Sequence, residues 1–163
     1  GGIANTFLAV NNNIGKSLAS SELITEAEKL LSIYKERIII PVDAVVKTNN
    51  GNQIKEIFNI SSDDIIYDIG PKTIELYSKY INESSTIFLN GTVGKYEEEE
   101  YGNGTKEILK SVSHSNAYTV IGGGDALSSA EYFNISNFDF ISTGGGATLN
   151  YIASEKLICF DNE

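Results

Sequence analysis

The sequence predicts an α/β fold, a three-layer αβα arrangement with a Rossmann-like parallel sheet of about six strands and a small hairpin. Two observations support this prediction. Short apolar runs alternate with amphipathic stretches along the whole chain. Within most of these runs apolar and polar residues do not alternate, which is typical of strands that helices cover on both faces. A chain of 163 residues has the length of one domain, so we expect a single domain over residues 1–163.

The expected elements follow from the spacing of the apolar residues. A helix is predicted where they recur every three or four positions, as Leu23, Ala27 and Leu30 do. A strand is predicted where a short apolar run lies between turn residues. Pro71 is expected in the first turn of a helix, where its missing N–H is not needed. The elements are, in order, a helix over residues 22–34, a strand over 38–42, a hairpin of 44–47 and 54–58, a strand over 65–69, a helix over 71–80, a strand over 86–89, a helix over 98–111, a strand over 118–121, a helix over 125–133, a strand over 138–141, a helix over 147–152 and a strand over 157–160.

The composition excludes several kinds of function. The net charge of −10 argues against binding to nucleic acid or to an anionic membrane surface, because both attract basic proteins. No apolar run approaches the roughly 20 residues that a membrane span needs, and no signal peptide is visible, so we expect a cytoplasmic protein. The single cysteine forms no disulfide framework. The chain begins with Gly1 and contains no Met, so we expect a processed chain or a piece of a longer one.

Glycine-rich turns follow four of the predicted strands, and each turn precedes a helix. In a parallel sheet such turns lie together at the carboxyl ends of the strands, where open α/β sheets bind ligands. Glycine lets the backbone approach a ligand closely, and the free N–H groups at a helix start form a site for anions such as phosphate. An acidic chain is therefore still able to bind a polyanionic small molecule. The turns are Asp68-Ile69-Gly70-Pro71, Asn90-Gly91-Thr92-Val93-Gly94, Gly122-Gly123-Gly124-Asp125 and Ser142-Thr143-Gly144-Gly145-Gly146, and Gly1-Gly2, before a short helix, is a candidate fifth.

Asp125 has two interpretations that the sequence leaves open. It could cap the helix that it precedes by accepting backbone N–H bonds. It could instead hold Mg²⁺ against nucleotide phosphates, because Mg²⁺ in proteins binds one or two carboxylates plus phosphate oxygens. Neither the dinucleotide fingerprint Gly-x-Gly-x-x-Gly nor the P-loop motif Gly-x-x-x-x-Gly-Lys-Ser/Thr occurs. Gly15-Lys16-Ser17 lacks the upstream glycine and strand of a P-loop, so we interpret it as a loop.

The motifs have a specific order along the chain: Gly1-Gly2-Ile3-Ala4-Asn5-Thr6-Phe7-Leu8, Ile14-Gly15-Lys16-Ser17, Pro41-Val42-Asp43, Asp68-Ile69-Gly70-Pro71-Lys72-Thr73, Asn90-Gly91 with Val93-Gly94 and Glu97, Gly104-Thr105, Gly122-Gly123-Gly124-Asp125 and Ser142-Thr143-Gly144-Gly145-Gly146-Ala147. In this order they resemble phosphoglycerate kinase over nearly the whole chain. The resemblance implies the C-terminal, nucleotide-binding domain of that two-lobed kinase, without the N-terminal lobe and without the first strand and helix of the C-terminal domain. The kinase transfers a phosphoryl group between 1,3-bisphosphoglycerate and ADP, giving 3-phosphoglycerate and MgATP.

The resemblance assigns roles to the positions that match the family's motifs. It implies ADP or ATP with Mg²⁺ as the bound groups, held largely by backbone N–H groups. Phosphoryl transfer agrees with this, because it needs positioning and charge stabilisation more than covalent chemistry. By resemblance, Gly1 and Gly2 line the adenine pocket, Val93 packs near the nucleotide, and Asn90 and Glu97 meet the ribose. Gly123 and Gly124 offer N–H groups to the phosphates beside Gly122, which also belongs to the nucleotide site, and Asp125 binds Mg²⁺. Gly144 and Gly145 donate N–H groups near the transferred phosphoryl group, with Gly124 and Gly145 as the catalytic positions.

The chain departs from the family's pattern at several positions. Ala126 stands where the family usually has Ser or Thr, Thr92 where it has Pro, and Ile66 where a glycine is expected, so that Ile66 could crowd the adenine pocket. The absent N-terminal lobe holds phosphoglycerate, so we expect the chain alone to be inactive and the full-length enzyme to be a monomer. A divergent, non-catalytic relative that acts as a regulatory or interaction module stays an alternative. An oxidoreductase domain is disfavoured, because the dinucleotide fingerprint is missing.

Overall fold

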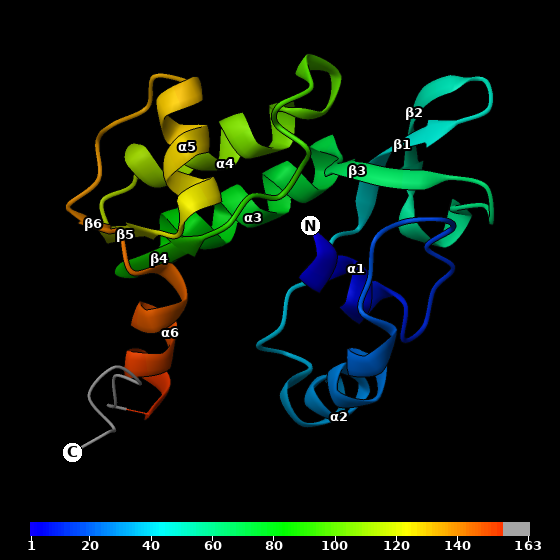
Figure 1. The fold of residues 1–163 in the computed structure, drawn as a ribbon, viewed down its shortest axis with the longest axis horizontal. Coiled ribbons are helices and arrows are strands. Elements are labelled where there is room, and N and C mark those ends of the chain that lie inside the picture. Colours follow the sequence, from blue (N-terminus) through cyan, green and yellow to red (C-terminus); the bar gives the residue numbers. More distant parts are fainter. Residues whose placement is uncertain (155–163) are drawn as a thin grey trace. The chain divides into compact units, whose positions relative to one another are not determined.

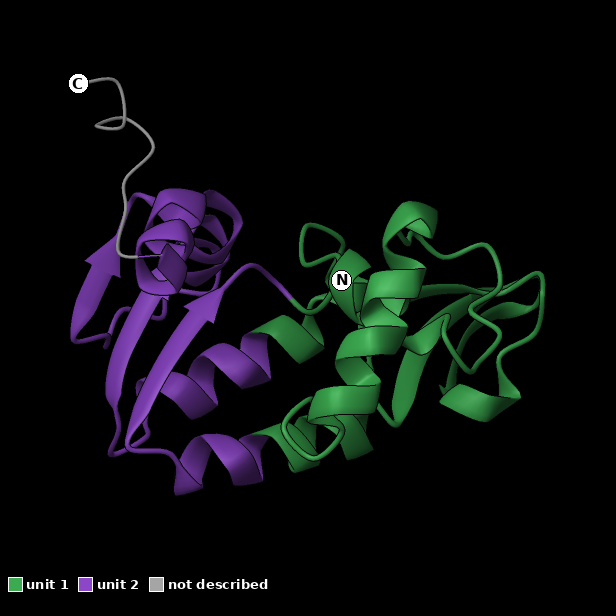
Figure 2. Cartoon of the chain, turned by 90° about the horizontal axis from the view of Figure 1, so that it is seen from below, with its two compact units in different colours: residues 1–77, 93–105 green, residues 78–92, 106–163 purple. Residues whose placement is uncertain are grey.

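The computed structural model describes residues 1–154 (Figure 1), and the strand predicted over residues 157–160 lies outside them. The described residues divide into two compact units (Figure 2). Unit 1 comprises residues 1–77 and 93–105, and unit 2 comprises residues 78–92 and those from 106 onward. The helices α3 (Pro71–Glu83) and α4 (Asn103–Ser113) each begin in unit 1 and end in unit 2.

Unit 1 contains an antiparallel sheet and the helices around it. The other elements of this unit are α1 (Gly2–Leu8), η1 (Ser21–Leu23), α2 (Ile24–Tyr34), β1 (Asp43–Thr48), β2 (Gly51–Glu56), η2 (Ile57–Asn59), β3 (Ile65–Ile69) and η3 (Glu99–Tyr101). The strand order is β2-β1-β3, and β1 pairs antiparallel with both neighbours. The β1–β2 hairpin agrees with the prediction, and its turn is closed by the Thr48 hydroxyl, which donates to the Gly51 carbonyl (2.7 Å) and accepts the Asn50 N–H (3.0 Å). The core of unit 1 consists of Leu8, Ala44, Val46, Ile57 and Ile60.

The strand predicted over residues 38–42 is wrong. This segment forms no strand, and two of its backbone groups bond to side chains of α3, while the Val42 carbonyl accepts the Ile57 N–H (3.0 Å). The Tyr77 hydroxyl donates to the Ile39 carbonyl (3.0 Å), and the Val42 N–H donates to the Thr73 hydroxyl (3.0 Å). Pro41 has no N–H to offer to a ladder. The apolar run is therefore held by a helix rather than by a sheet.

Unit 2 contains a parallel sheet with strand order β4-β5-β6. Its elements besides the ends of α3 and α4 are β4 (Thr86–Asn90), β5 (Tyr118–Gly122), α5 (Gly124–Tyr132), β6 (Phe140–Ser142) and α6 (Gly145–Ser154). A helix follows each strand, as parallel pairing requires. Leu109 of α4, Ile121 of β5, and Ala126 and Ala130 of α5 form the buried core. In this unit the predicted strand–helix alternation is confirmed.

The α/β class is confirmed, but the parallel sheet has three strands in the described residues instead of about six, because β1, β2 and β3 form a separate antiparallel sheet. Of the strands predicted for the parallel sheet, residues 38–42 form no strand, residues 65–69 (β3) pair antiparallel with β1, and residues 157–160 lie outside the described residues. Helix α4 also begins at Asn103 rather than at residue 98, because η3 forms a separate turn before it. No helix within residues 1–154 is long and apolar enough to cross a membrane.

Candidate nucleotide site

The three parallel strands of unit 2 end at the same level. Asn90 of β4 pairs with Gly122 of β5, and Gly122 pairs with Ser142 of β6. The turns after these strands therefore begin side by side at one edge of the sheet, the edge where ligands bind in sheets of this kind. The structure thus brings together the two triple-glycine turns that the sequence singled out.

The backbones of the two triple-glycine turns touch. A Cβ atom at position 145 would lie 3.0 Å from the Cα of Gly123, and a Cβ at position 123 would lie 2.5 Å from Oδ1 of Asn90. Gly123 also has a φ of 90°, a conformation that side chains disfavour. The predicted ribose residue Asn90 is therefore in contact with the predicted phosphate residues. Only glycine at position 123 permits this close arrangement.

Helix α5 begins with free backbone N–H groups. Its N-cap residue is Gly123, and no side chain caps this end. The Leu127 N–H donates to the Gly123 carbonyl (3.1 Å), so the N–H groups of Gly124, Asp125 and Ala126 precede the first bond of the helix. The space beside Gly124 is open, since a Cβ there would have no heavy atom within 4 Å. Such a helix start is suited to an anion such as phosphate.

Asp125 is the second residue of α5, and its side chain is exposed. The helix cap that the sequence left open for it is not observed, because no side chain caps α5. A single exposed carboxylate beside free N–H groups fits Mg²⁺ that is shared with phosphate oxygens and water. Within the described residues no three His, Cys, Asp or Glu side chains gather to bind a metal by themselves. Asp125 would therefore supply one ligand and depend on phosphate for the others.

The turn before α6 already uses one of its predicted phosphate donors. The Gly144 N–H donates to Oγ of Ser142 (3.3 Å), and this hydroxyl also bonds to the Thr148 hydroxyl (2.6 Å). Gly145 is buried at the first position of α6. The bond from the Gly144 N–H to Ser142 is long and therefore weak. A phosphoryl group could accept the Gly144 N–H only after this bond breaks.

The remaining predicted site residues lie in unit 1. The Gly1 amino group donates to the Val93 carbonyl (3.0 Å), which joins residues 92 positions apart in the sequence. Gly2 begins α1. Glu97 is exposed and belongs to the same segment as Val93, between β4 and α4. The structure therefore places Gly1 beside Val93.

Gly2 lines a cavity of about 560 Å³ in unit 1. The wall is almost entirely apolar, and Glu26 is its one charged residue. A flat heterocycle such as adenine suits a cavity of this size and character. The sequence did not predict its further lining residues, because α1, α2 and the loop before η1 meet only in the folded chain. They include Ile3, Phe7, Leu18, Leu23, Ala27 and Leu30.

Ile66 does not crowd this cavity. Its side chain is half-buried and packs against the core cluster of unit 1 around Leu8 and Val46. The residues that line the cavity come from α1, α2 and the loop between them. Ile66 is therefore not among the residues that line this cavity.

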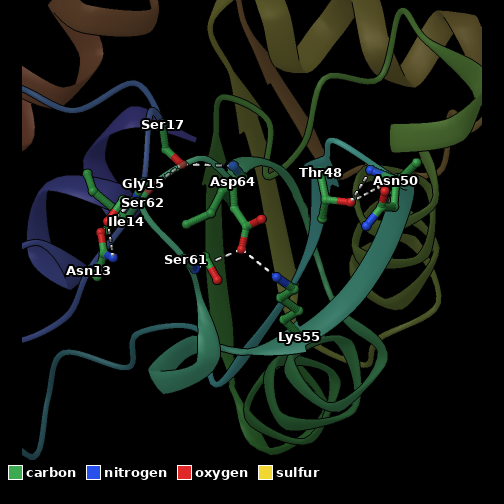
Figure 3. Close-up of polar contacts among 12 residues, drawn as sticks. Asn13, Ile14, Gly15, Ser17, Thr48, Asn50, Lys55, Ser61, Ser62 and Asp64 are labelled. Carbon is green, nitrogen blue, oxygen red and sulfur yellow. Dashed lines mark hydrogen bonds and ion pairs between the residues drawn. The ribbon is translucent and has the colours of Figure 1, made fainter.

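The loop between α1 and η1 is fastened to the start of β3 (Figure 3). The Lys16 N–H donates to the Asp64 carbonyl (2.8 Å), and Oγ of Ser17 accepts the Ile66 N–H (2.8 Å). The Asp64 carboxylate accepts bonds from the Lys55 amine (2.6 Å) and the Ser61 N–H (2.7 Å). Burial opposes ionisation of Asp64, but these two bonds hold its pKa below the usual range. Gly15-Lys16-Ser17 is a loop, as predicted. Its bonds to β3 hold the adjacent residue Leu18, which lines the cavity beside Gly2.

One buried charged residue was not assigned a role from the sequence. Asp68, near the end of β3, is 1% exposed. Burial raises the pKa of its carboxyl to about 6, against the opposing effect of N–H bonds from Gly104 and Ile69. The sequence feature that could have identified Asp68 is an acidic residue within an otherwise apolar strand. A charge in such a place needs compensating hydrogen bonds.

Comparisons with known proteins show which family the chain belongs to. The family model "Phosphoglycerate kinase" matches residues 1–155. The chain is 46% identical to phosphoglycerate kinase of Wigglesworthia glossinidia brevipalpis over 96% of its own length and 41% of that protein, and 44% identical to the enzyme of Buchnera aphidicola with the same coverage. The solved structure of phosphoglycerate kinase from Coxiella burnetii superposes with a TM-score of 0.89 at 34% identity, covering 96% of this chain and 43% of that one. The chain thus spans about two fifths of the length of these relatives, 41% and 43% in these two cases. It belongs to the phosphoglycerate kinase family.

Proposed function

We propose that this chain forms the nucleotide-binding part of phosphoglycerate kinase as a single nucleotide-binding domain over residues 1–163. The complete enzyme would transfer a phosphoryl group between 1,3-bisphosphoglycerate and ADP, giving 3-phosphoglycerate and MgATP. The observation that supports this most is the contact between Gly123 and Gly145, which joins two triple-glycine turns at the carboxyl edge of a parallel sheet. The enzyme would work in the cytoplasm as a monomer.

The proposed roles follow from where each residue lies. In unit 1, Gly1 and Gly2 would hold the adenine, Val93 would pack near the nucleotide and Glu97 would meet the ribose. In unit 2, Asn90 would also meet the ribose. Gly122, Gly123 and Gly124 would hold the phosphates at the start of α5, and Gly144 and Gly145 would donate to the transferred phosphoryl group, with Gly124 and Gly145 acting in the transition state. These backbone donors would stabilise negative charge on the phosphoryl group. Charge stabilisation is the main requirement of phosphoryl transfer, which needs little covalent chemistry from side chains.

Asp125 would hold Mg²⁺ against the phosphate oxygens. When bound, the ion neutralises phosphate charge during transfer. The side chain is exposed and caps no helix, so it is free to turn toward a ligand at the start of α5. Phosphoglycerate would bind to an N-terminal lobe that this sequence does not contain, and the chain alone would therefore be inactive.

Ala126 favours a second candidate, a non-catalytic regulatory or interaction module. Its side chain is fully buried in the core of unit 2 and is not able to bond to a phosphate. If the loss of that hydroxyl disables the site, the fold would persist without nucleotide binding. The two candidates differ in a single property, the magnesium-dependent affinity for an adenine nucleotide.

Calorimetric titration with MgADP tests the proposal. The unsubstituted chain should bind, and Asp125→Ala should bind at least about tenfold more weakly, because each lost charge contact of this kind costs on the order of 1.5–3 kcal/mol. Glu131→Ala, which removes another exposed carboxylate from α5, is the matched control and should bind as the unsubstituted chain does. If the unsubstituted chain shows no binding, the non-catalytic module becomes the better description.

A further inference from the structure

Asp68 is a buried carboxylate to which the proposed reaction gives no role. Its Oδ2 accepts the Gly104 N–H at 2.7 Å, and its Oδ1 accepts the Ile69 N–H at 2.8 Å. A buried carboxylate is tolerated where such bonds replace its hydration. The Gly104 bond crosses 36 residues of sequence, so this carboxylate joins β3 to the start of α4.

The segment over residues 93–104 lies closely against this carboxylate at both ends. A Cβ atom at Gly94 would lie 2.1 Å from Oδ1 of Asp68, and a Cβ at Gly104 would lie 2.2 Å from the same atom. Between them, the Lys95 N–H donates to the Tyr67 carbonyl (2.8 Å), and the Tyr101 ring packs on the Tyr67 ring with centroids 4.7 Å apart. The end of β3 therefore determines the course of this segment.

We propose that Asp68 is a positioning residue for the nucleoside, because its carboxylate holds the segment that carries Val93 and Glu97. The position of Val93 depends directly on Asp68, because its neighbour Gly94 lies against Oδ1 of Asp68. The Val93 carbonyl accepts a hydrogen bond from the Gly1 nitrogen. This inference rests on the proposed function. Asp68 itself touches no ligand in this scheme and acts only through the backbone that it holds.

The charge of Asp68 matters to this role. Burial raises the pKa of its carboxyl to about 6, and the N–H bonds from Gly104 and Ile69 act in the opposite direction. Lys95, the cation of the segment, is paired with Glu98 instead. At neutral pH the carboxylate is therefore an acceptor for both N–H groups. Protonation would replace one acceptor site with an O–H donor.

Asp68→Asn, compared with Asp43→Asn, tests the inference. Asp43 is equally buried, at 1% exposed, and also accepts two N–H groups, from Lys72 (3.0 Å) and Thr73 (2.8 Å), but these belong to the start of α3. We expect Asp68→Asn to weaken MgADP binding at least about tenfold, since the segment then loses a hydrogen bond to a charged group, and such a bond corresponds to about a tenfold change or more. Asp43→Asn should change the affinity by less than about threefold. Amide hydrogen exchange at Lys95 and Gly104 should accelerate only in Asp68→Asn.

The other possible results of this experiment each contradict the positioning role of Asp68 or lead to a second measurement that tests it. If the unsubstituted chain binds MgADP and both variants lose the same affinity, or neither does, the positioning role is wrong while the proposed function stands. If the unsubstituted chain does not bind, the proposed function fails and this inference fails with it. If Asp68→Asn does not fold, the unsubstituted chain is followed by NMR: the amide resonances of Gly104 and Val93 should titrate together near pH 6, and independent behaviour would overturn the inference.

Discussion

The backbones of Gly123 and Gly145 are in contact, so that a Cβ atom at position 145 would lie 3.0 Å from the Cα of Gly123. The turns after β5 and β6 therefore form one continuous backbone surface. Side chains at this contact would push the two turns apart. Glycine here is a requirement of packing as well as of ligand approach.

Gly123→Ala should destabilise the chain by about 1–3 kcal/mol, because it forces a side chain into a left-handed backbone conformation. The new Cβ would also lie 2.5 Å from Oδ1 of Asn90. Gly124→Ala is the control, since a Cβ at this position meets open space and alanine suits a helix. Urea unfolding of both variants measures the difference. Equal destabilisation would contradict the geometry at Gly123.

Asp68 should make stability fall as the pH rises. Its pKa of about 6 in the folded chain exceeds the value of about 3.9 in an unfolded chain, so the folded state binds more protons between these values. The contribution is fully present below about pH 4 and is lost as the pH rises through 6, and it amounts to about 3 kcal/mol. Urea unfolding across this range, with Asp68→Asn beside the unsubstituted chain, isolates the effect. Profiles of identical slope would show that Asp68 does not titrate in this way.

Lys55→Ala should destabilise the chain by about 3 kcal/mol, because it leaves a buried carboxylate without its partner. The Asp64 side chain is 5% exposed and the Lys55 side chain 19%. Lys16→Ala removes the cation of an exposed pair with Asp63, whose side chains are 64% and 65% exposed, and should cost less than about 1 kcal/mol. Thermal or urea unfolding distinguishes the two variants. Similar losses of unfolding free energy in the two variants would mean that the burial of Asp64 does not strengthen its ion pair with Lys55.

The sequence predicted unit 2 more fully than unit 1. In unit 2 each strand is followed by a glycine turn and a helix, and this local order alone requires parallel pairing with the turns at one edge. In unit 1 the apolar run over residues 38–42 has the composition of a strand. Its backbone partners, Thr73 and Tyr77, lie more than thirty positions away in the sequence, at separations of 31 and 38 residues. The local sequence pattern around residues 38–42 therefore does not indicate these bonds.

The sequence by itself determined the α/β class, the glycine turns and the family resemblance, because periodicity and turn chemistry act between residues close together in the chain. Only the tertiary structure decided that β1 to β3 form a separate antiparallel sheet, that an apolar cavity opens beside Gly2 and that Asp68 is buried against Gly94 and Gly104. These properties depend on which distant segments exclude water from one another. Burial and the pKa shift that it causes therefore belong to the folded chain and not to any stretch of its sequence.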